Sequence, residues 1–356
     1  MSFRNTEVLR HFAIDQAVDA YGNGHINETY LVESHHRYIL QKINTSIFKK
    51  PEDVMENISA VTEHLRKKIL AAGGDPLRET LTLVPTVDGK SYYVAPDGSA
   101  YRMYYFIERA VSLDQAETPE IFAASAHAFG KFQRMLADFP ADRLHEVIPK
   151  FHDTSDRLRQ FREAVERDAV GRAASVQKEI DFVLSHADCV TRVTDAMAEG
   201  SVPLRVTHND TKLNNVMLDD QTYEGVCVID LDTVMPGSML YDFGDSLRFG
   251  ASTATEDETD LDKVWFDLTY FEAYTKAFIE EVGDTMTAKE RELLPFSALL
   301  LTLECGMRFL TDYLNGDTYF RIHREHHNLD RCRTQFKLVA DMESKMEQMK
   351  SIVAKY

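Results

Sequence analysis

The chain has 356 residues, a formal net charge of −18 at pH 7 and 44% hydrophobic residues. Its length allows about two domains, and its hydrophobic content is typical of a folded protein rather than a disordered one. A strongly negative surface repels phosphate backbones and anionic lipids. This charge argues against nucleic acid or a membrane as the main partner and favours a neutral or cationic small molecule.

The longest apolar stretch, Leu293 to Leu303, is interrupted by polar residues. It is shorter than the roughly 20 apolar residues that span a bilayer, so we expect a buried helix. No apolar signal segment follows the first residues, and the four cysteines lack C-x-x-C spacing. We therefore expect a cytoplasmic protein with free thiols. Its oligomeric state stays unknown at this level.

Strand and turn signals dominate residues 1–108, which we predict to be an N-terminal nucleotide-binding lobe. Residues 109–356 are mostly helical patterns, predicted to form a C-terminal catalytic and substrate-binding lobe. In the first region, glycines followed by alternating strand formers predict a tight hairpin turn, and apolar spacing after Pro51 predicts a helix. We expect a five-stranded antiparallel sheet with one packed helix, including strands at 37–43, 81–84, 92–95 and 101–107.

In the second region, Thr118 and Pro119 provide a cap and a first-turn proline for a helix that ends before Pro140. Apolar residues at helical spacing predict further helices, at about 155–198, 262–282, 288–314 and 331–353. Two short strands are expected at 205–207 and 225–229.

Residues 208–215 have the form H-x-D-x-x-x-x-N, and a later apolar strand ends in Asp230. Phosphoryl transfer from ATP needs a carboxylate that accepts the proton of the attacking hydroxyl. Mg²⁺ prefers hard oxygen ligands such as an amide and a carboxylate. This order of residues is also that of protein kinases. It predicts Asp210 as the base and Asn215 and Asp230 as Mg²⁺ ligands.

Two neighbouring residues each allow two roles. Lys212 lies between the predicted base and Asn215, where it either contacts the γ-phosphate or only pairs with Asp210. Asp230 and Asp232 occupy alternating positions of an expected strand and would share one face. Asp232 is then either a supporting residue or a second metal contact.

The nucleotide is expected between the two regions. Backbone amides around Gly22 and Gly24 would approach the phosphates, whereas most hairpins of this kind are only turns. Phe106, Ile107 and Glu108 lie where the β-rich region meets the helical one. They are expected to bind adenine through backbone groups, or else to form only a last strand and a linker. No P-loop motif and no G-x-S-x-G motif occurs.

Together these motifs resemble the aminoglycoside phosphotransferase and choline kinase superfamily. Longer stretches are similar to the N-acetylhexosamine 1-kinases within it, at 21–27, 44–48, 204–215, 229–239, 242–250 and 304–310. The resemblance implies an α+β, bilobal protein-kinase-like fold with a small antiparallel-sheet lobe and a large, mainly helical lobe. It implies ATP and Mg²⁺ as cofactors and phosphorylation of the anomeric hydroxyl of N-acetylglucosamine or N-acetylgalactosamine. It also implies the same base and Mg²⁺ ligands.

The resemblance further implies a sugar pocket in the helical lobe. We expect Phe249, Arg308 and Tyr319 to line it, with His25 reaching in from the glycine hairpin. An aromatic face and a planar donor fork suit a neutral sugar with hydroxyls and an acetamido group. The alternatives are a surface ion pair for Arg308 and a packed core position for Phe249.

One position departs from the superfamily. Its kinases usually place Lys or Arg on the third strand to hold the ATP phosphates, but the matching residue here is Gln41, with Lys42 on the opposite face. Either the strand is shifted, or Gln41 donates neutral hydrogen bonds. Two alternative functions stay open: a kinase for another acceptor (an aminoglycoside, choline, homoserine or methylthioribose), and a pseudokinase that binds without turnover.

Overall fold

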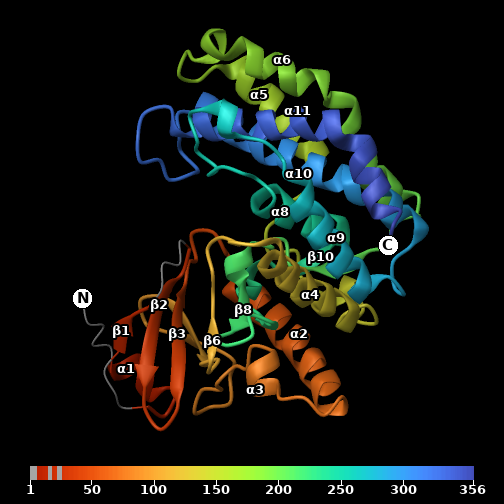
Figure 1. The fold of residues 1–356 in the computed structure, drawn as a ribbon. Helices are drawn as coiled ribbons and strands as arrows, with labels where there is room; N and C mark the ends of the chain where they lie inside the picture. The colour runs from red at the N-terminus through yellow and green to blue at the C-terminus, as the bar shows by residue number, and fades with distance from the viewer. Residues whose placement is uncertain (1–5, 15–17, 22–25) are drawn as a thin grey trace.

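The computed structural model describes residues 6–14, 18–21 and 26–356. A sheet-rich N-terminal part and a mainly helical C-terminal part lie one above the other (Figure 1). This arrangement confirms the predicted α+β fold with a small sheet lobe and a large helical lobe. The predicted boundary at residue 108 stays a prediction. Just beyond it, β6 (Ala110–Val111) pairs with β8 (Val216–Asp219) of the large lobe.

The small lobe contains the expected antiparallel sheet of five strands, in the order β1-β2-β3-β5-β4. Its register places Thr29, Gln41 and Arg102 side by side across β2, β3 and β5. Alternation along the strands directs one set of side chains to α1 and the other set to α2. The bounds are α1 Thr6–Arg10, β1 Val18–Ala20, β2 Glu28–Glu33, β3 Arg37–Ile43, β4 Tyr93–Val94, β5 Ala100–Tyr105 and α3 Pro76–Glu79.

The strand expected at 81–84 is wrong as a strand, because it forms only an isolated bridge between Leu83 and Tyr104. Pro85 follows directly and has no N–H to extend a ladder. The strand expected at 92–95 is reduced to the two residues of β4.

Helix α2 (Pro51–Ala71) is the predicted packed helix of the small lobe, and its buried face includes Val54, Ile58 and Val61. Its polar residue Asn57 is also buried. The Asn57 amide donates hydrogen bonds to the carbonyls of His145 at 2.8 Å and Val234 at 2.9 Å. Since both carbonyls lie outside the small-lobe sheet, α2 is hydrogen-bonded to the large lobe.

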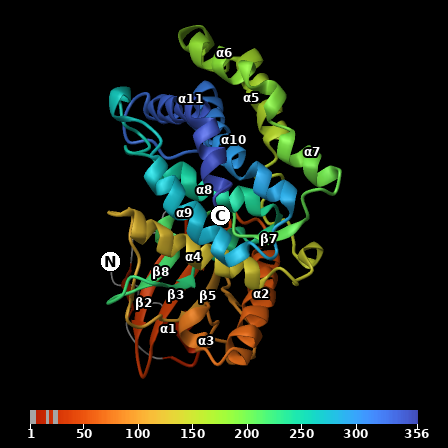
Figure 2. The ribbon, with the colours of Figure 1, turned by 45° about the vertical axis from the view of Figure 1, so that its right-hand side comes forward.

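The large lobe is built around α10 (Ala288–Leu314), which packs against α8 (Met239–Gly250) and α11 (His327–Val353). By length and composition α10 qualifies as a membrane span, but 89% of its most apolar window is buried inside the fold. This confirms the expected buried helix. Helices α5, α6 and α7 follow one another along the outside (Figure 2). The bounds are α4 Pro119–Met135, α5 Thr154–Arg167, α6 Gln177–Ser185, α7 Arg192–Ala198, α9 Leu268–Val282 and α11 His327–Val353.

The short strands expected in the large lobe are present. Strand β7 (Arg205–Thr207) pairs with β10 (Met235–Gly237), and β8 pairs with β9 (Gly225–Val228). Helix α8 (Met239–Gly250) was not predicted, and it is almost completely buried. A Cβ atom at Gly244 would lie 2.4 Å from the Ser297 carbonyl oxygen of α10. Only glycine therefore permits this close approach of α8 to α10.

Candidate active site

The loop between β7 and β8 contains the predicted base, and a buried histidine supports it. His208 donates from Nε2 to the Ile229 carbonyl at 2.8 Å and accepts the Asp210 N–H on Nδ1 at 3.3 Å. An imidazole that donates on one side and accepts on the other is neutral. His208 therefore joins the loop to the end of β9 and is not itself a base.

Two aspartates of α8 hold the backbone of this loop. The buried Asp242 carboxylate accepts the N–H groups of His208 at 2.9 Å and Asn209 at 2.8 Å. Burial raises the pKa of Asp242, and these backbone donors act in the opposite direction. Asp245 accepts the Thr211 N–H at 3.1 Å. Helix α8 thus fixes the residues on both sides of Asp210.

The predicted base lies between two other predicted residues. The Asp210 carboxylate pairs with Lys212 Nζ at 2.7 Å and accepts from Asn215 Nδ2 at 3.0 Å. Its side chain is 23% exposed, so it faces solvent from a supported position. Although burial opposes protonation of Lys212, the Asp210 carboxylate raises the pKa of the ammonium group. Lys212 therefore remains charged at neutral pH, in the Asp210-paired arrangement.

The predicted strand placement of Asp230 and Asp232 is wrong. Strand β9 ends at Val228, Asp230 has a left-handed backbone with φ 57°, and Leu231–Thr233 form a 3-10 turn. The two carboxylates consequently do not alternate along a strand. Asp232 is buried and forms an ion pair with Arg102 of β5, so it supports the site and is not exposed to a ligand.

The predicted Mg²⁺ ligands have the chemistry of a cation site. The Asn215 N–H₂ group is used by Asp210, which leaves the Asn215 amide oxygen available. Burial, followed by the Asp232 and Asp210 carboxylates, raises the pKa of Asp230 to about 7. Within the described part of the chain, no group donates a hydrogen bond to the Asp230 carboxylate. Hard oxygens with excess negative charge fit Mg²⁺.

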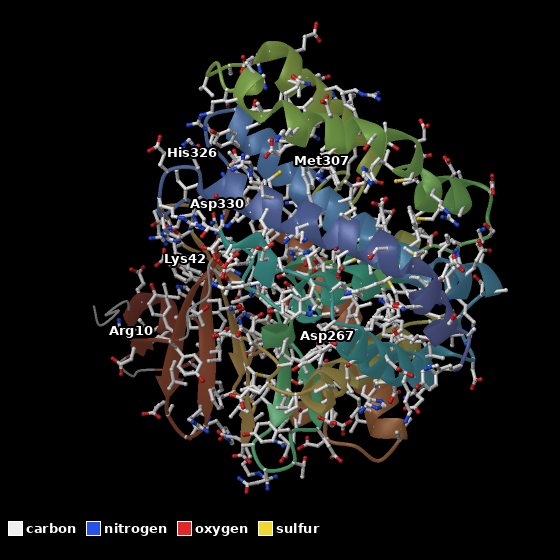
Figure 3. The ribbon with its side chains drawn as sticks, turned by 45° about the horizontal axis from the view of Figure 1, so that its top comes forward. Arg10, Lys42, Asp267, Met307, His326 and Asp330 are labelled. Atoms are coloured by element: carbon white, nitrogen blue, oxygen red, sulfur yellow. The ribbon has the colours of Figure 1, made fainter. Side chains whose placement is uncertain are left out.

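The structure gives the third-strand position a role within the sheet. Gln41 Nε2 donates to Thr29 Oγ1 at 3.2 Å, and Gln41 Oε1 accepts from Arg102 Nε at 3.0 Å. Both ends of its amide are therefore engaged. Lys42 lies where the sheet meets the helical lobe (Figure 3) and pairs with Glu28 at 3.5 Å. Gly22, Gly24 and His25 lie outside the described residues.

In the predicted adenine segment, one residue has both its backbone N–H and its carbonyl free of other described residues. The Phe106 N–H donates to the Arg37 carbonyl at 3.0 Å. The Glu108 carboxylate pairs with Arg37, and its carbonyl accepts from Arg78. Ile107 is buried, and no other described residue hydrogen-bonds its N–H or carbonyl. Of the three, only Ile107 can offer a backbone donor and acceptor to adenine.

Two of the residues that were predicted to line the sugar pocket, Arg308 and Tyr319, lie in one aromatic cluster. The Arg308 guanidinium carbon lies 5.3 Å from the Phe151 ring centroid and 5.6 Å from that of Phe320. The Tyr319 ring lies 4.8 Å from Phe320 and is 66% exposed as a residue. The Arg308 side chain is only 17% exposed, 3.8 Å from Glu304. Arg308 is therefore less exposed than a residue in a surface ion pair, which was the alternative role suggested by the sequence.

A buried pair links this cluster to the loop that contains Asp210. His152 Nδ1 lies 3.1 Å from Glu304 Oε1, and His152 Nε2 lies 3.3 Å from the Asn209 carbonyl. Burial opposes protonation of His152, but the Glu304 carboxylate raises its pKa. Sequence analysis missed His152, because no local pattern shows that the residue will face Glu304.

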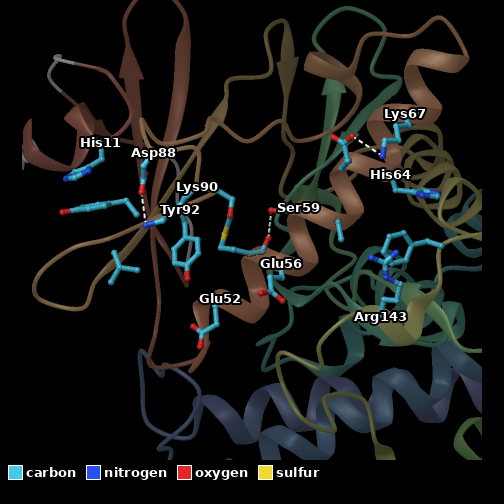
Figure 4. A pocket seen from close by; sticks show the side chains of 17 residues that line it. His11, Glu52, Glu56, Ser59, His64, Lys67, Asp88, Lys90, Tyr92 and Arg143 are labelled. Atoms are coloured by element: carbon cyan, nitrogen blue, oxygen red, sulfur yellow. Dashed lines mark hydrogen bonds and ion pairs between the residues drawn. The ribbon is translucent and has the colours of Figure 1, made fainter.

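Phe249 is not brought together with Arg308 and Tyr319. It is half-buried and lines a cavity of about 690 Å³ with Leu213, Tyr270 and other residues, which do not include Arg308 or Tyr319. A larger cavity of about 1070 Å³ lies between α2 and the β4 region, and Phe139 and Arg143 of the large lobe also line it (Figure 4). None of the predicted site residues lines this larger cavity, so it is not the candidate active site.

Residues 18–274 match the family model APH, described as the phosphotransferase enzyme family. The chain belongs to this family. The APH match runs from β1 into the first half of α9, and thus includes the loop with Asp210 and the Asp230 turn. It shows that the protein is a small-molecule phosphotransferase, within the superfamily that the sequence motifs resemble.

Solved structures share the fold of this APH-family protein over almost all of both chains. An aminoglycoside phosphotransferase from Alicyclobacillus acidocaldarius aligns with a TM-score of 0.66 at 13% identity, covering 99% of this chain and 97% of that one. A microcompartment-associated aminopropanol kinase aligns at 0.59 and 16%, covering 97% of each chain. An amicoumacin kinase, in complex with AMP-PNP, Ca²⁺ and Ami, aligns at 0.59 and 14%, covering 96% and 94%. At these identities the likeness shows the fold alone.

Proposed function

We propose that this phosphotransferase transfers the γ-phosphoryl group of Mg²⁺-bound ATP to the anomeric hydroxyl of N-acetylglucosamine or N-acetylgalactosamine. The products would be ADP and the sugar 1-phosphate. One observation carries the reaction type: the partly exposed Asp210 carboxylate lies 2.7 Å from Lys212 Nζ, on a loop fixed by α8. This is a supported carboxylate with a cation beside it, as transfer to a hydroxyl requires.

In this mechanism the anomeric hydroxyl donates a hydrogen bond to Asp210. As the new O–P bond forms, the proton passes to the carboxylate and the bond between the γ-phosphorus and ADP breaks. Lys212 is charged and lies next to Asp210, so it stabilises negative charge that develops on the transferring group. Asn215 and Asp230 would hold Mg²⁺, which neutralises phosphate charge when bound. Ile107 would bind adenine.

The acceptor assignment rests on the Arg308 cluster and on the motif resemblance. A guanidinium between the rings of Phe151 and Phe320, with exposed Tyr319 beside them, offers planar donors and apolar faces. These groups suit a neutral ring with hydroxyls and an acetamido group. The His152–Glu304 pair connects them to the loop that precedes Asp210.

The test is ADP release with ATP and Mg²⁺ against N-acetylglucosamine, N-acetylgalactosamine, galactose, choline and kanamycin. We expect the N-acetylhexosamines to turn over fastest and the product to lose its reducing end, with a sugar phosphate signal by ³¹P NMR. Asp210→Asn should reduce this ADP release. Its matched control is Asp262→Asn, at an exposed aspartate distant in sequence from the loop. Turnover of choline or kanamycin that is faster than that of the N-acetylhexosamines would overturn the sugar assignment. The proposed kinase reaction would still stand.

A cationic acceptor is the second candidate, because the chain carries a net charge of −18 and one structural neighbour is an aminopropanol kinase. The partly buried Arg308 guanidinium opposes it, since a cation in the acceptor pocket repels a cationic ligand. Nucleotide binding without ADP release with any acceptor in the panel would contradict the proposed reaction.

A further inference from the structure

Arg102 is a charged residue in the interior of the small lobe. Its side chain is 1% exposed, on β5 between Tyr101 and Met103. A buried guanidinium is unfavourable unless it is paired and hydrogen-bonded. Its partners here are the Asp232 carboxylate and Gln41 Oε1, the latter at 3.0 Å.

A row of polar side chains across the sheet orients the Arg102 guanidinium. Thr29, Gln41 and Arg102 are aligned on adjacent strands, and Gln41 bonds to both neighbours. Gln41 therefore cannot rotate its amide without losing a hydrogen bond. The positive charge that the superfamily usually places on the third strand lies one strand further, on β5, and Gln41 orients it.

The other partner, Asp232, belongs to the large lobe and follows Asp230 by two residues. One Asp232 oxygen pairs with Arg102, and the other accepts from Asn27 Nδ2 at 2.6 Å. Asn27 in turn accepts the Asn44 N–H at 2.9 Å. Two small-lobe residues therefore bind the Asp232 carboxylate of the large lobe: Asn27, just before β2, and Arg102 of β5.

Helix α2 takes no part in this charge pairing. The contact that α2 makes with the Arg102 guanidinium is a weak hydrogen bond to the Met55 sulfur at 4.0 Å. This sulfur is uncharged. In protein kinases, by contrast, the third-strand lysine pairs with a glutamate of the small-lobe helix. Here α2 is fixed through Asn57 instead, and the sheet is coupled directly to the Asp230 turn.

We propose that Arg102 is a positioning residue for phosphoryl transfer, which orients Asp230 by clamping Asp232 to the small-lobe sheet. Asp232 is then the large-lobe half of this clamp and not a second metal ligand. The proposal rests on the proposed kinase function, because it concerns the geometry of a Mg²⁺ ligand. It does not depend on which acceptor is used.

The experiment measures binding of AMP-PNP by calorimetry, with and without Mg²⁺, so that no acceptor is required. The variants are Arg102→Met, Arg102→Lys, Asp232→Asn, Gln41→Leu and the charge-balanced double variant Arg102→Met/Asp232→Asn. The matched control is Arg10→Met, at an exposed arginine of α1 (Figure 3). Thermal unfolding identifies variants that do not fold.

Outer partners of metal ligands typically contribute about 10- to 100-fold to metal affinity or activity. We expect such a loss of Mg²⁺-dependent AMP-PNP affinity in Arg102→Met and Asp232→Asn. A loss of the same order should persist in the folded double variant, although its buried charge is balanced. Arg102→Lys should recover part of the affinity, because an ammonium can still pair with Asp232. Where turnover is measurable, kcat should fall while the acceptor KM stays within about twofold.

A folded double variant that binds Mg²⁺ and AMP-PNP as tightly as the wild type would show that the pair serves only stability, and would overturn the proposal. Gln41→Leu keeps both charges and tests the same clamp if the arginine variants unfold. It should weaken Mg²⁺-dependent binding by about tenfold or more, as expected for one hydrogen bond to a charged group, and unchanged binding would equally overturn the proposal. Wild-type binding without turnover of any acceptor would contradict only the proposed function.

Discussion

The backbone N–H of Asn209 donates to Asp242 Oδ1 at 2.8 Å, and Asn209 itself has a left-handed backbone with φ 65°. Asp210 follows directly, so the orientation of the proposed base depends on a carboxylate of α8. The same carboxylate also accepts from Gln133 of α4 at 2.5 Å. The loop is therefore held in a conformation that few residues adopt unaided.

Asp242→Asn should lower both stability and turnover. An asparagine side chain has one acceptor oxygen and an N–H₂ group, so it cannot accept both backbone N–H groups that Asp242 binds. Leaving a buried donor unsatisfied costs about 1–3 kcal/mol. We expect the free energy of unfolding, measured with urea, to fall by this amount. Equal stability and equal kcat in the variant would contradict the role assigned to Asp242.

Asp210→Asn should remove the base and preserve nucleotide binding. General-base catalysis contributes about 10²- to 10⁴-fold to turnover, so we expect kcat for the best acceptor to fall by at least 10²-fold. The AMP-PNP affinity, measured by calorimetry with Mg²⁺, should change much less. Asp262→Asn serves as the control. Near-wild-type turnover by Asp210→Asn would exclude it as the base.

Arg308→Met should raise the KM for the acceptor and leave the KM for ATP unchanged. The substitution keeps an apolar side chain of similar length but removes the guanidinium donors that lie near Phe151 and Phe320. Loss of a hydrogen bond from a charged group costs about 1.5–3 kcal/mol, so the acceptor KM should rise by about tenfold or more. The matched control is Arg324→Met, at an arginine paired with Asp257. A changed ATP KM with an unchanged acceptor KM would refute the placement of the pocket.

Gly244→Ala should destabilise the protein although alanine is the better helix former. The new Cβ would meet the Ser297 carbonyl oxygen at 2.4 Å, so α8 must move away from α10. Overpacking of this kind typically costs about 1–3 kcal/mol. Because α8 holds the catalytic loop, kcat should decrease as well. Urea unfolding that shows increased stability would mean that the two helices do not approach this closely.

The His152–Glu304 pair should stabilise the fold in a limited pH range. The Glu304 carboxylate raises the pKa of His152 above its ordinary value of 6.5 against the effect of burial, and the His152 imidazolium lowers that of Glu304 below 4.5. The His152 contribution is fully present below 6.5 and is lost as the pH rises through its folded-state pKa. The Glu304 contribution is present above 4.5 and is lost as the pH falls through its own folded-state pKa.

His152→Gln should therefore cost about 3 kcal/mol between pH 4.5 and 6.5, as expected for removing one partner of a buried pair. The difference from the wild type should narrow as the pH rises beyond the folded-state pKa of His152. Urea unfolding at several pH values provides the measurement. The control is His127→Gln, whose ring is 45% exposed beside Glu281, and which should show only a small difference in the free energy of unfolding. A pH-independent cost for His152→Gln would rule out a charged pair.

Much of the architecture follows from local patterns. The hairpin strands, α2, α4 and α10 were predicted because their periodicity lies within a few turns of chain. Helix α8 was missed, because it carries aspartates and glycines that are poor helix formers by themselves. It forms because Leu240, Phe243 and Leu247 are buried in the large-lobe core. Tertiary packing there outweighs intrinsic propensity.

The proximity of the proposed catalytic residues was predictable from the sequence, because Asp210, Lys212 and Asn215 lie within one short loop whose spacing places them together. The charge beside this loop could be identified only from the tertiary structure. The register of β3 with β5 sets Arg102 beside Gln41, and the contact between the lobes brings Asp232 to it. Strand register and lobe contact depend on packing between distant segments, and no local spacing along the chain encodes them.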